Sequence, residues 1–443
     1  MINTFKTLYK KEPENFAILV IMMASILFRI YYMLATSVYD MQHDVGTPYE
    51  NYGHLGYISY LMQNHHLPDF DVREAFQFWH PPLHHFISAV FLSICWKLFP
   101  HLQGNWEPIQ ILPFIYITIT IWILYRILKL WNIQGKALIL TTLILAFHPR
   151  IITLSGSVNN DTLCVFLSFL AFYLALLWFR NSNWKYIISC AISIGLAMSS
   201  KGSAAILAFP IAFLFLVKLW QEKWPILKQL ILFGIIALPL GMWWYVRNHI
   251  MFDMPLNYIY YMATDFIGYL GNVPVTERIF NFDPRYYNFQ NLYLQFEGRY
   301  TDINPIIGLL KTAVFGQWHF NYNIYIKFFA LPLLIFWIIL CTLTLISIPS
   351  FFRKKAQTLH ENISIILLFI IQFFVYYKFC LDYPFVWSMD FRYTLPLLIC
   401  HGILIGHYMN SEMKFSKYIG YVCIGFAMLS CICFGLLGLT FIL

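Results

Sequence analysis

Apolar segments about 20 residues long recur along the whole chain, and they constrain its fold more than any other feature. A helix of that length crosses the hydrocarbon core of a bilayer. Only 11% of the residues are charged, whereas average soluble proteins carry about 25%. The sequence therefore predicts an all-α integral membrane protein with about 11 transmembrane helices, over the windows 16–36, 109–130, 137–154, 161–179, 184–199, 203–220, 226–246, 326–349, 362–380, 391–409 and 417–441.

The few charges are spread along the chain rather than gathered in one basic segment, although the formal net charge is +8. A nucleic-acid-binding protein normally shows a basic stripe, and a disordered protein is rich in charge and poor in apolar residues. The sequence therefore excludes both classes. The nine cysteines fall mostly within the predicted spans and form no CxxC pair, so they indicate small core residues rather than a disulfide or metal framework.

Basic residues determine the predicted orientation, because lysine and arginine mark short cytoplasmic loops. All the basic clusters lie on the inner side only if Leu83–Phe99 does not cross the membrane completely. We therefore expect this segment to lie on, or dip into, the outer face, and the N-terminus to be cytoplasmic. The alternative, a full crossing, places every later loop on the opposite side. Sixteen of the 29 basic residues lie in six short segments: Lys6–Lys11, Arg126–Lys136, Arg180–Lys185, Lys218–Lys228, Arg353–Lys355 and Lys414–Lys417.

We expect a single polytopic membrane domain over residues 1–443. Two long stretches lie mostly outside the predicted spans. Residues 37–108 form the predicted first outer loop, with juxtamembrane helices, and residues 247–325 form a second long outer loop. The first apolar segment is too long for the core of a signal peptide, so we expect an uncleaved span there.

The predicted topology places the unusual charged residues on one side of the membrane. Charges at or just inside a membrane edge are costly and are usually paired or functional. Their location on one face predicts a shared outward-facing cavity. The residues concerned are Asp44, Asp161, Lys201, Arg247 and Arg392.

Each of these charges also has a structural interpretation. Asp161 follows two asparagines at the mouth of a span and could cap that helix. Lys201 and Arg247 could be snorkelling side chains at helix ends. Asp44 lies beside a glycine in a loop with few acids, where it either caps a juxtamembrane helix or acts as a general base near the membrane surface.

Histidines are concentrated in the first outer loop, where seven of the 14 lie between His43 and His85. A metal site is conceivable there, but no HExxH or similar spacing occurs. We therefore favour hydrogen bonding to a phosphate or a sugar over metal binding.

Six short motifs in a fixed order resemble those of the GT-C membrane glycosyltransferases, in particular the branch of the protein O-mannosyltransferases and the lipid A aminoarabinose transferase. No single motif is specific, but their order agrees with the topology derived from the basic residues. The likeness extends to about residue 400. The motifs are Asp44 in the first outer loop, His80-Pro81-Pro82-Leu83, Asn160-Asp161, Lys201-Gly202, Trp243-Trp244-Tyr245-Val246-Arg247-Asn248 and Arg392-Tyr393 with Pro396.

The resemblance implies an enzyme that transfers one sugar from a polyprenyl-phosphate carrier to an acceptor hydroxyl on the outer face, with inversion. Asp44 matches the family's catalytic acid, and one carboxylate suffices for inversion. Cations or hydrogen-bond donors must stabilise the departing phosphate; the candidates are His80, Lys201, Arg247 and Arg392, with Asp161 as a further donor-binding residue. Tyr49, Trp79 and Trp243 are candidates for stacking on sugar rings, although aromatic residues also anchor membrane interfaces. We expect no metal or other cofactor, a glycan, lipid or protein acceptor, and a location in the cell membrane.

The sequence departs from the O-mannosyltransferase pattern at two places. Asp44 is followed by Val45 rather than by a glutamate, and Leu83 is followed by His84-His85 rather than by Gly-Lys. The acceptor class and the phosphate ligands therefore stay open. A transporter or flippase for a lipid-linked or small anionic substrate is the alternative function. The location of the charges at the outer edge and the absence of an internal repeat favour an enzyme.

Overall fold

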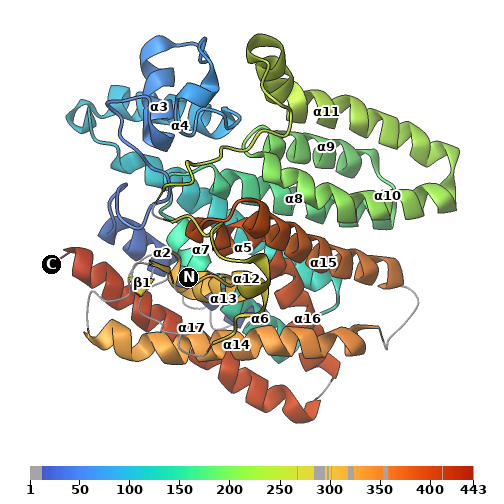
Figure 1. Cartoon of the computed structure of the whole chain (residues 1–443). Helices are drawn as coiled ribbons and strands as arrows, with labels where there is room; N and C mark the ends of the chain where they lie inside the picture. Colours follow the sequence, from blue (N-terminus) through green and yellow to red (C-terminus); the bar gives the residue numbers. More distant parts are fainter. Residues whose placement is uncertain are drawn as a thin grey trace. The chain divides into compact units, whose positions relative to one another are not determined.

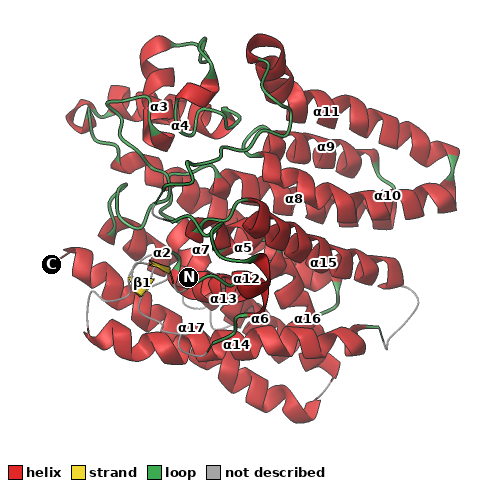
Figure 2. Cartoon of the chain, viewed as in Figure 1, coloured by secondary structure: helices red, strands yellow, loops and turns green. Residues whose placement is uncertain are grey.

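A computed structural model describes residues 12–266, 268–283, 295–296, 299–300, 302–317, 324–352, 358–411 and 413–442. Helices make up nearly all of its regular structure (Figures 1 and 2). In the described part of the chain the strands are two residues long, β1 (Gln295–Phe296) and β2 (Arg299–Tyr300), and they pair antiparallel with Gln295 opposite Tyr300. The predicted helical class is therefore confirmed.

Among the described residues, eight helices are long and apolar enough to span a membrane, and the chain is a multi-pass membrane protein. They coincide with eight of the predicted windows. Where a short 3₁₀ turn precedes the α-helix, it is counted as part of the span. The helices are α2 (Pro13–Ala35), η3–α5 (Glu107–Gln110 and Ile111–Leu130), α8 (Asp161–Asn181), η4–α10 (Gly202–Leu207 and Ala208–Glu222), α11 (Trp224–Phe252), α14 (Ile324–Phe351), α15 (Leu359–Asp382) and α17 (Met413–Ile442).

The other three windows contain shorter helices. Window 137–154 is divided into α6 (Gly135–Ala146) and α7 (Pro149–Leu154), because a proline disfavours helical backbone in the residue before it and suits the first position of a new helix. Window 184–199 is α9 (Trp184–Met198), and window 391–409 holds the 3₁₀ turn η8 (Phe391–Thr394) and α16 (Leu397–Ser411), separated by Pro396. The count of eleven spans stays a prediction.

The first predicted outer loop contains two helices, α3 (Gly53–Asn64) and α4 (Leu83–Leu98), and the 3₁₀ turns η1 (Val72–Glu74) and η2 (Pro100–Leu102). At 1.5 Å per residue, α4 is about 24 Å long, which is shorter than the roughly 30 Å hydrocarbon core. One apolar face of α4 is exposed, and its members recur every four residues: Phe86, Val90, Ile94 and Leu98. This length and this face agree with a helix that lies on or dips into the membrane.

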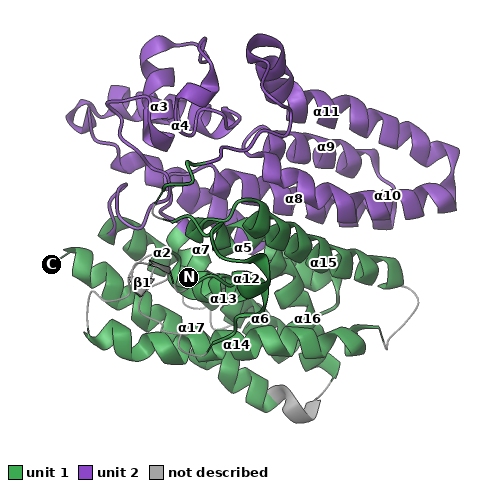
Figure 3. Cartoon of the chain, in the orientation of Figure 1, with its two compact units in different colours: residues 1–35, 124–153, 262–443 green, residues 36–123, 154–261 purple. Residues whose placement is uncertain are grey.

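The chain divides into two compact units (Figure 3). The first consists of Met1–Ala35, Leu124–Thr153 and Met262–Leu443, and the second of Thr36–Ile123 and Leu154–Tyr261. Both contain helices that are long enough to span a membrane, and the single polytopic domain stays a prediction. The basic segments at residues 6–11 and 353–355 lie outside the described residues, as does part of the predicted second outer loop.

The second unit is built around α8, α9 and α11, and α10 packs against α8 and α11. Helix α3 packs against α4. Buried side chains of the first outer loop form one core with residues of the later helices and loops. The core includes Leu55, Tyr57, Phe78, Trp79, Leu92, Val158 and Trp244.

The first unit contains α2, α6 and α14–α17, with α14 packed against α16 and α17. Helix α13 (Pro305–Phe315) packs on α14 and is capped by Asn304, whose Oδ1 accepts hydrogen bonds from the amides of Ile306 and Ile307. Its Lys311 forms a buried ion pair with Asp302, at 2.7 Å. The cap and the ion pair fix α13, which contributes to the polar cluster described below. Two short elements complete the unit, α12 (Val275–Phe280) and the 3₁₀ turn η7 (Val386–Met389).

Candidate functional site

The main chain around Asp44 caps the first turn of α3. The carbonyl oxygen of Asp44 accepts a hydrogen bond from the amide of His54 at 3.0 Å, and that of Val45 accepts one from the amide of Leu55 at 2.8 Å. The first amides of a helix have no partner within the helix, so these carbonyls satisfy them. The backbone carbonyl of Asp44 therefore caps α3, and the role of its carboxylate stays a prediction.

His54 connects this loop to the predicted His-Pro-Pro-Leu motif. Its ring lies parallel to that of His80, with 6.2 Å between the centroids. Its Nδ1 lies 2.9 Å from Nε2 of His85, which stacks on Tyr57 at 4.3 Å. His54 is therefore hydrogen-bonded through its amide to the backbone of Asp44 and lies with its ring parallel to that of His80.

His84 and His85 are buried and contact protein atoms. Nε2 of His84 donates to the carbonyl oxygen of Val158 at 2.7 Å. Burial lowers the pKa of His84 to about 4 and that of His85 well below its usual value, so both are neutral at pH 7. Among the described residues, no group of three histidine, cysteine, aspartate or glutamate side chains is arranged to hold a metal ion.

Asp161 and Lys201, selected from two separate motifs, form an ion pair. Nζ of Lys201 lies 2.5 Å from Oδ1 of Asp161, and the side chains are 12% and 6% exposed. The neighbouring residues reinforce the pair, because Asn160 and Ser200 exchange two hydrogen bonds, of 2.9 and 3.1 Å. Asp161 begins α8, and Oδ1 of Asn159 accepts a hydrogen bond from its amide.

Arg247 joins the end of α11 to the first outer loop. Its guanidinium donates to Oδ1 of Asn248 at 2.6 Å and to the carbonyl oxygen of Pro68, and it lies over the ring of Trp244 at 4.9 Å. Protein atoms therefore hold this cation, and its predicted role in phosphate binding stays a prediction.

The three aromatic candidates differ in exposure. Trp79 is 9% exposed, and its ring stacks on Tyr260 with 4.7 Å between centroids and 7° between planes. Trp243 is 38% exposed and donates to Oγ of Ser199 at 3.0 Å. Tyr49 is 87% exposed, between the bridge partners Thr47 and Tyr52. Tyr49 and Trp243 therefore present more open surface than Trp79.

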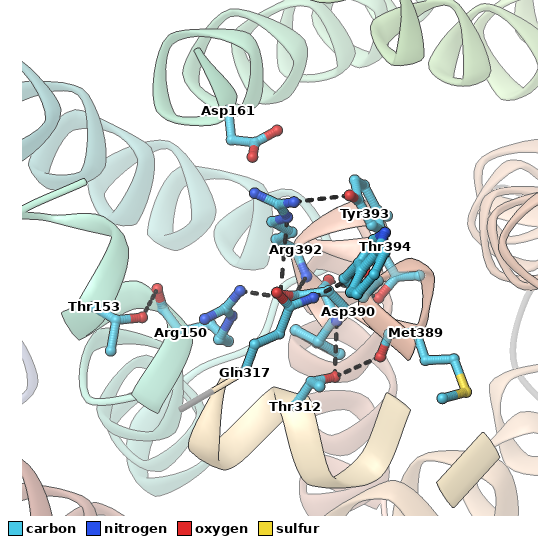
Figure 4. Close-up of polar contacts among 12 residues, drawn as sticks. Arg150, Thr153, Asp161, Thr312, Gln317, Met389, Asp390, Arg392, Tyr393 and Thr394 are labelled. Carbon is cyan, nitrogen blue, oxygen red and sulfur yellow. Dashed lines mark hydrogen bonds and ion pairs between the residues drawn. The ribbon is translucent and has the colours of Figure 1, made fainter. Parts of the chain in front are cut away.

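Arg392 belongs to the first unit, where it lies in a buried polar cluster around Asp390 (Figure 4). Oδ1 of Asp390 accepts from Nη2 of Arg150 at 2.6 Å and from the amide of Arg392 at 2.8 Å. The Arg392 guanidinium lies 3.8 Å from the other carboxylate oxygen and donates to the hydroxyl of Tyr393. Thr312 of α13 accepts from the amide of Phe391, which fixes the turn.

Sequence reasoning missed Arg150 and the pairing of His54 with His85. Arg150 was visible as a charged residue inside an apolar window, directly after Pro149. A charge in such a window is costly unless it has a partner, and this was the available signal. The histidine pair had no such signal, because the two residues lie 31 positions apart without a recognisable spacing.

The structure thus brings together three sets of residues. In the second unit, Asp44 and His80 both lie against His54, and Asp161 pairs with Lys201. In the first unit, Arg392 shares Asp390 with Arg150. The predicted shared cavity stays a prediction.

Comparisons with known proteins relate the chain to glycosyltransferases. Residues 79–243 match the family model described as dolichyl-phosphate-mannose-protein mannosyltransferase. This range contains the motifs at His80–Leu83, Asn160-Asp161 and Lys201-Gly202, whereas Asp44, Arg247 and Arg392 lie outside it. No curated protein sequence matches the chain significantly.

Several solved structures are similar. A crystal structure of an Archaeoglobus fulgidus oligosaccharyltransferase with Zn and sulfate is 14% identical, with a TM-score of 0.53, and the match covers 94% of this chain and 53% of that one. The archaeal oligosaccharyltransferase AglB from the same organism, with an inhibitory peptide and a dolichol-phosphate, is 13% identical, with a TM-score of 0.51 and coverages of 96% and 55%. ArnT from Cupriavidus metallidurans in the apo state is 13% identical, with a TM-score of 0.40 and coverages of 90% and 79%.

The chain spans about half the length of the two oligosaccharyltransferases. At this level of identity the likeness concerns the fold alone, which is similar to that of these two oligosaccharyltransferases. Together with the family-model match, it confirms the resemblance predicted from the motifs.

Proposed function

We propose that the protein transfers a sugar from a polyprenyl-phosphate carrier to an acceptor hydroxyl on the outer face of the cell membrane, with inversion at the anomeric carbon. The observation that carries the proposal is the arrangement around His54, whose amide donates to the carbonyl oxygen of Asp44 and whose ring lies parallel to that of His80. The GT-C fold and the mannosyltransferase match over residues 79–243 support it.

Asp44 acts as the general base in this proposal. The acceptor hydroxyl must lose its proton while its oxygen attacks the anomeric carbon, and a carboxylate within hydrogen-bond reach accepts that proton. Direct attack by the acceptor inverts the configuration, and it needs no second carboxylate to form a glycosyl-enzyme.

The departing lipid phosphate requires positive charge. Lys201 supplies a positive charge and N–H donors, and in the structure it pairs with Asp161 at 2.5 Å. In the first unit, two guanidinium groups share the carboxylate of Asp390. We propose Lys201 and Arg392 as phosphate ligands, with His80, Arg247 and Asp161 as further donor contacts.

The exposed aromatic side chains would bind sugar or acceptor. Tyr49 and Trp243 offer open ring faces near the first outer loop and the end of α11, whereas one face of Trp79 is covered by Tyr260. The acceptor is a glycan, lipid or protein hydroxyl. We expect transfer to be independent of divalent metal.

The test is Asp44→Asn, which removes the negative charge and keeps the size of the side chain. In native membranes given radiolabelled dolichyl-phosphate-mannose, we expect the variant to lose 10²-fold or more of the transfer of label from the lipid to non-lipid products, because general base catalysis contributes about 10²–10⁴-fold. Retention of the wild-type rate would overturn the assignment.

Glu50→Gln is the matched control, since Glu50 is an exposed carboxylate in the same loop. We expect it to transfer label at the wild-type rate. Addition of EDTA tests the metal-independent mechanism in the same assay, and loss of transfer that Mg²⁺ or Mn²⁺ restores would contradict it.

A further inference from the structure

We propose that Gly46 and Gly53 are positioning residues for Asp44. The inference rests on the proposed role of Asp44 as the general base. The main chains of the two glycines pack against each other, and this contact closes the loop that carries Asp44 onto the first turn of α3. Neither glycine touches the substrate in this proposal; both act through the conformation of the loop.

Only glycine fits at these two positions. A Cβ atom on Gly53 would lie 2.4 Å from Cα of Gly46, and one on Gly46 would lie 1.9 Å from the carbonyl oxygen of Tyr52. The obstructing atoms belong to the backbone and cannot rotate away. Both residues also have positive φ angles, 65° and 77°, which are strained for residues with a side chain.

Closure of the loop determines where Asp44 lies. The bridge between Thr47 and Tyr52, at 3.2 Å from amide to carbonyl, brings the two ends of the loop together. The carbonyl of Asp44 then meets the amide of His54. Asp44 itself has a φ of 55°, a left-handed conformation that is uncommon for residues other than glycine and is maintained here by the hydrogen bond.

The first turn of α3, on which this loop closes, is itself held in place by contacts with other parts of the chain. The amide of Gly53 donates to the carbonyl oxygen of Phe76 at 3.0 Å. The side chain of His54 is 2% exposed and is joined to His85 of α4. Because α3 is held on both sides, we expect a clash at Gly46, or at Gly53 in the first turn of α3, to displace the loop that carries Asp44 more than the rest of the helix.

The consequence for catalysis follows from the distance dependence of proton transfer. A displacement of about 1 Å at a reacting group costs about 10²-fold in rate. An added Cβ at Gly53 requires a movement of that order, since ordinary contact begins at 3.4 Å and this Cβ would lie 2.4 Å from Cα of Gly46.

The first experiment measures amide hydrogen exchange of residues 44–56 in wild type, Gly46→Ala and Gly53→Ala. We expect the amides of His54 and Leu55 to be protected in wild type and to exchange at least tenfold faster in both variants. Gly104→Ala is the matched control, because Gly104 also has a positive φ, 82°, but a Cβ there meets no atom within 4 Å. Unchanged exchange in Gly53→Ala, or an equal change in Gly104→Ala, overturns the inference.

The second experiment measures transfer from radiolabelled dolichyl-phosphate-mannose. We expect Gly53→Ala to lower kcat about 10²-fold with the KM for the lipid unchanged, and Gly104→Ala to keep the wild-type kcat. In the Asp44→Asn background, Gly53→Ala should cause no further loss, because the two changes act on one group. Additive losses overturn the inference.

The two proposals fail in different ways. If Asp44→Asn transfers label at the wild-type rate, Asp44 is not the base, whatever the exchange data show. If Asp44→Asn is inactive while Gly53→Ala keeps the wild-type kcat, Asp44 is the base and the glycines do not position it.

Discussion

At the scale of single residues, the carboxylate of Asp390 is the most informative buried charge outside the loop of Asp44. Its side chain is 0% exposed and contacts Arg150 at 2.6 Å and Arg392 at 3.8 Å. A buried ion pair contributes little compared with apolar packing, but removal of one partner leaves a buried charge without compensation.

We therefore expect Asp390→Asn to destabilise the protein by about 3–5 kcal/mol. The asparagine keeps an oxygen for the amide of Arg392, so the change mainly removes charge. Thermal unfolding of detergent-solubilised protein measures the effect. The control is Asp382→Asn, since Asp382 forms an exposed pair with Lys378 and such pairs contribute about 0–1 kcal/mol. Equal shifts in the two variants would contradict the prediction.

The buried histidine His84 makes stability depend on pH. Its pKa is about 4 in the folded protein because of burial, and about 6.5 in the unfolded chain. The unfolded state therefore binds more protons between these values, and stability falls as the pH falls below 6.5.

Between pH 7 and pH 5 we expect the neutral His84 ring to account for a loss of roughly 2 kcal/mol. His84→Gln keeps a donor for the carbonyl of Val158 but cannot be protonated, so its unfolding temperature should fall less on acidification. The exposed His101 supplies the control His101→Gln, for which the wild-type pH dependence is expected. An unchanged pH dependence in His84→Gln would disprove this account.

The sequence identified charged residues better than their partners. Asp161, Lys201 and Arg392 were selected because charge is scarce near apolar windows. Arg392 lies two residues from its partner Asp390, whereas the other ion pairs could not be predicted, because they join positions 40 residues apart, as in Asp161 with Lys201, or 240 apart, as in Arg150 with Asp390. Sequence spacing carries no signal at these separations.

At the scale of elements, apolar windows predicted the long helices well and the interrupted ones poorly. Eight windows correspond to helices of 18 residues or more, because continuous apolar sequence and helix length are directly related in a membrane protein. Windows 137–154 and 391–409 contain Pro149 and Pro396, and the helices begin anew at these points. Both prolines are evident in the sequence, but the mean hydropathy of a window does not show where a proline interrupts the helix.

Helix α4 shows how an element can be apolar without being long enough to span. Its exposed stripe from Phe86 to Leu98 raises its apolar content to that of a span, while His84 and Ser88 on the other side are buried against protein. The mean hydropathy of the segment combines the exposed and the buried faces of α4, and only the structure shows which residues belong to each face.

At the scale of the whole molecule, the position of α4 determines the side on which every later loop lies. If α4 does not cross, Gly104 lies outside and Gly135 inside. These two glycines are well matched for labelling, since both have positive φ angles and open space around the position of a Cβ.

We expect a cysteine at position 104 to react with a membrane-impermeant maleimide in intact cells, and a cysteine at position 135 to react only after the cells are opened. Wild-type protein provides the background from its own cysteines, of which Cys95, Cys341 and Cys431 are partly exposed. Reaction of position 104 only in opened cells would mean that α4 crosses the membrane.

The division into two units was not predictable from composition. The first unit is assembled from three separate stretches of chain and the second from two. No linker rich in glycine, proline or charge marks the points where the chain passes from one unit to the other, so the division depends on long-range packing that single-sequence patterns do not contain.

The pairing of Arg150 with Asp390 has a consequence for biosynthesis. A ribosome that adds roughly 5–20 residues per second needs about 10–50 s to make the 240 residues between them. During this interval the guanidinium of Arg150 has been synthesised and the carboxylate of Asp390 does not yet exist. The nascent chain must therefore keep Arg150 next to water, lipid phosphate or the insertion machinery, and the first unit can complete its interior only near the end of translation.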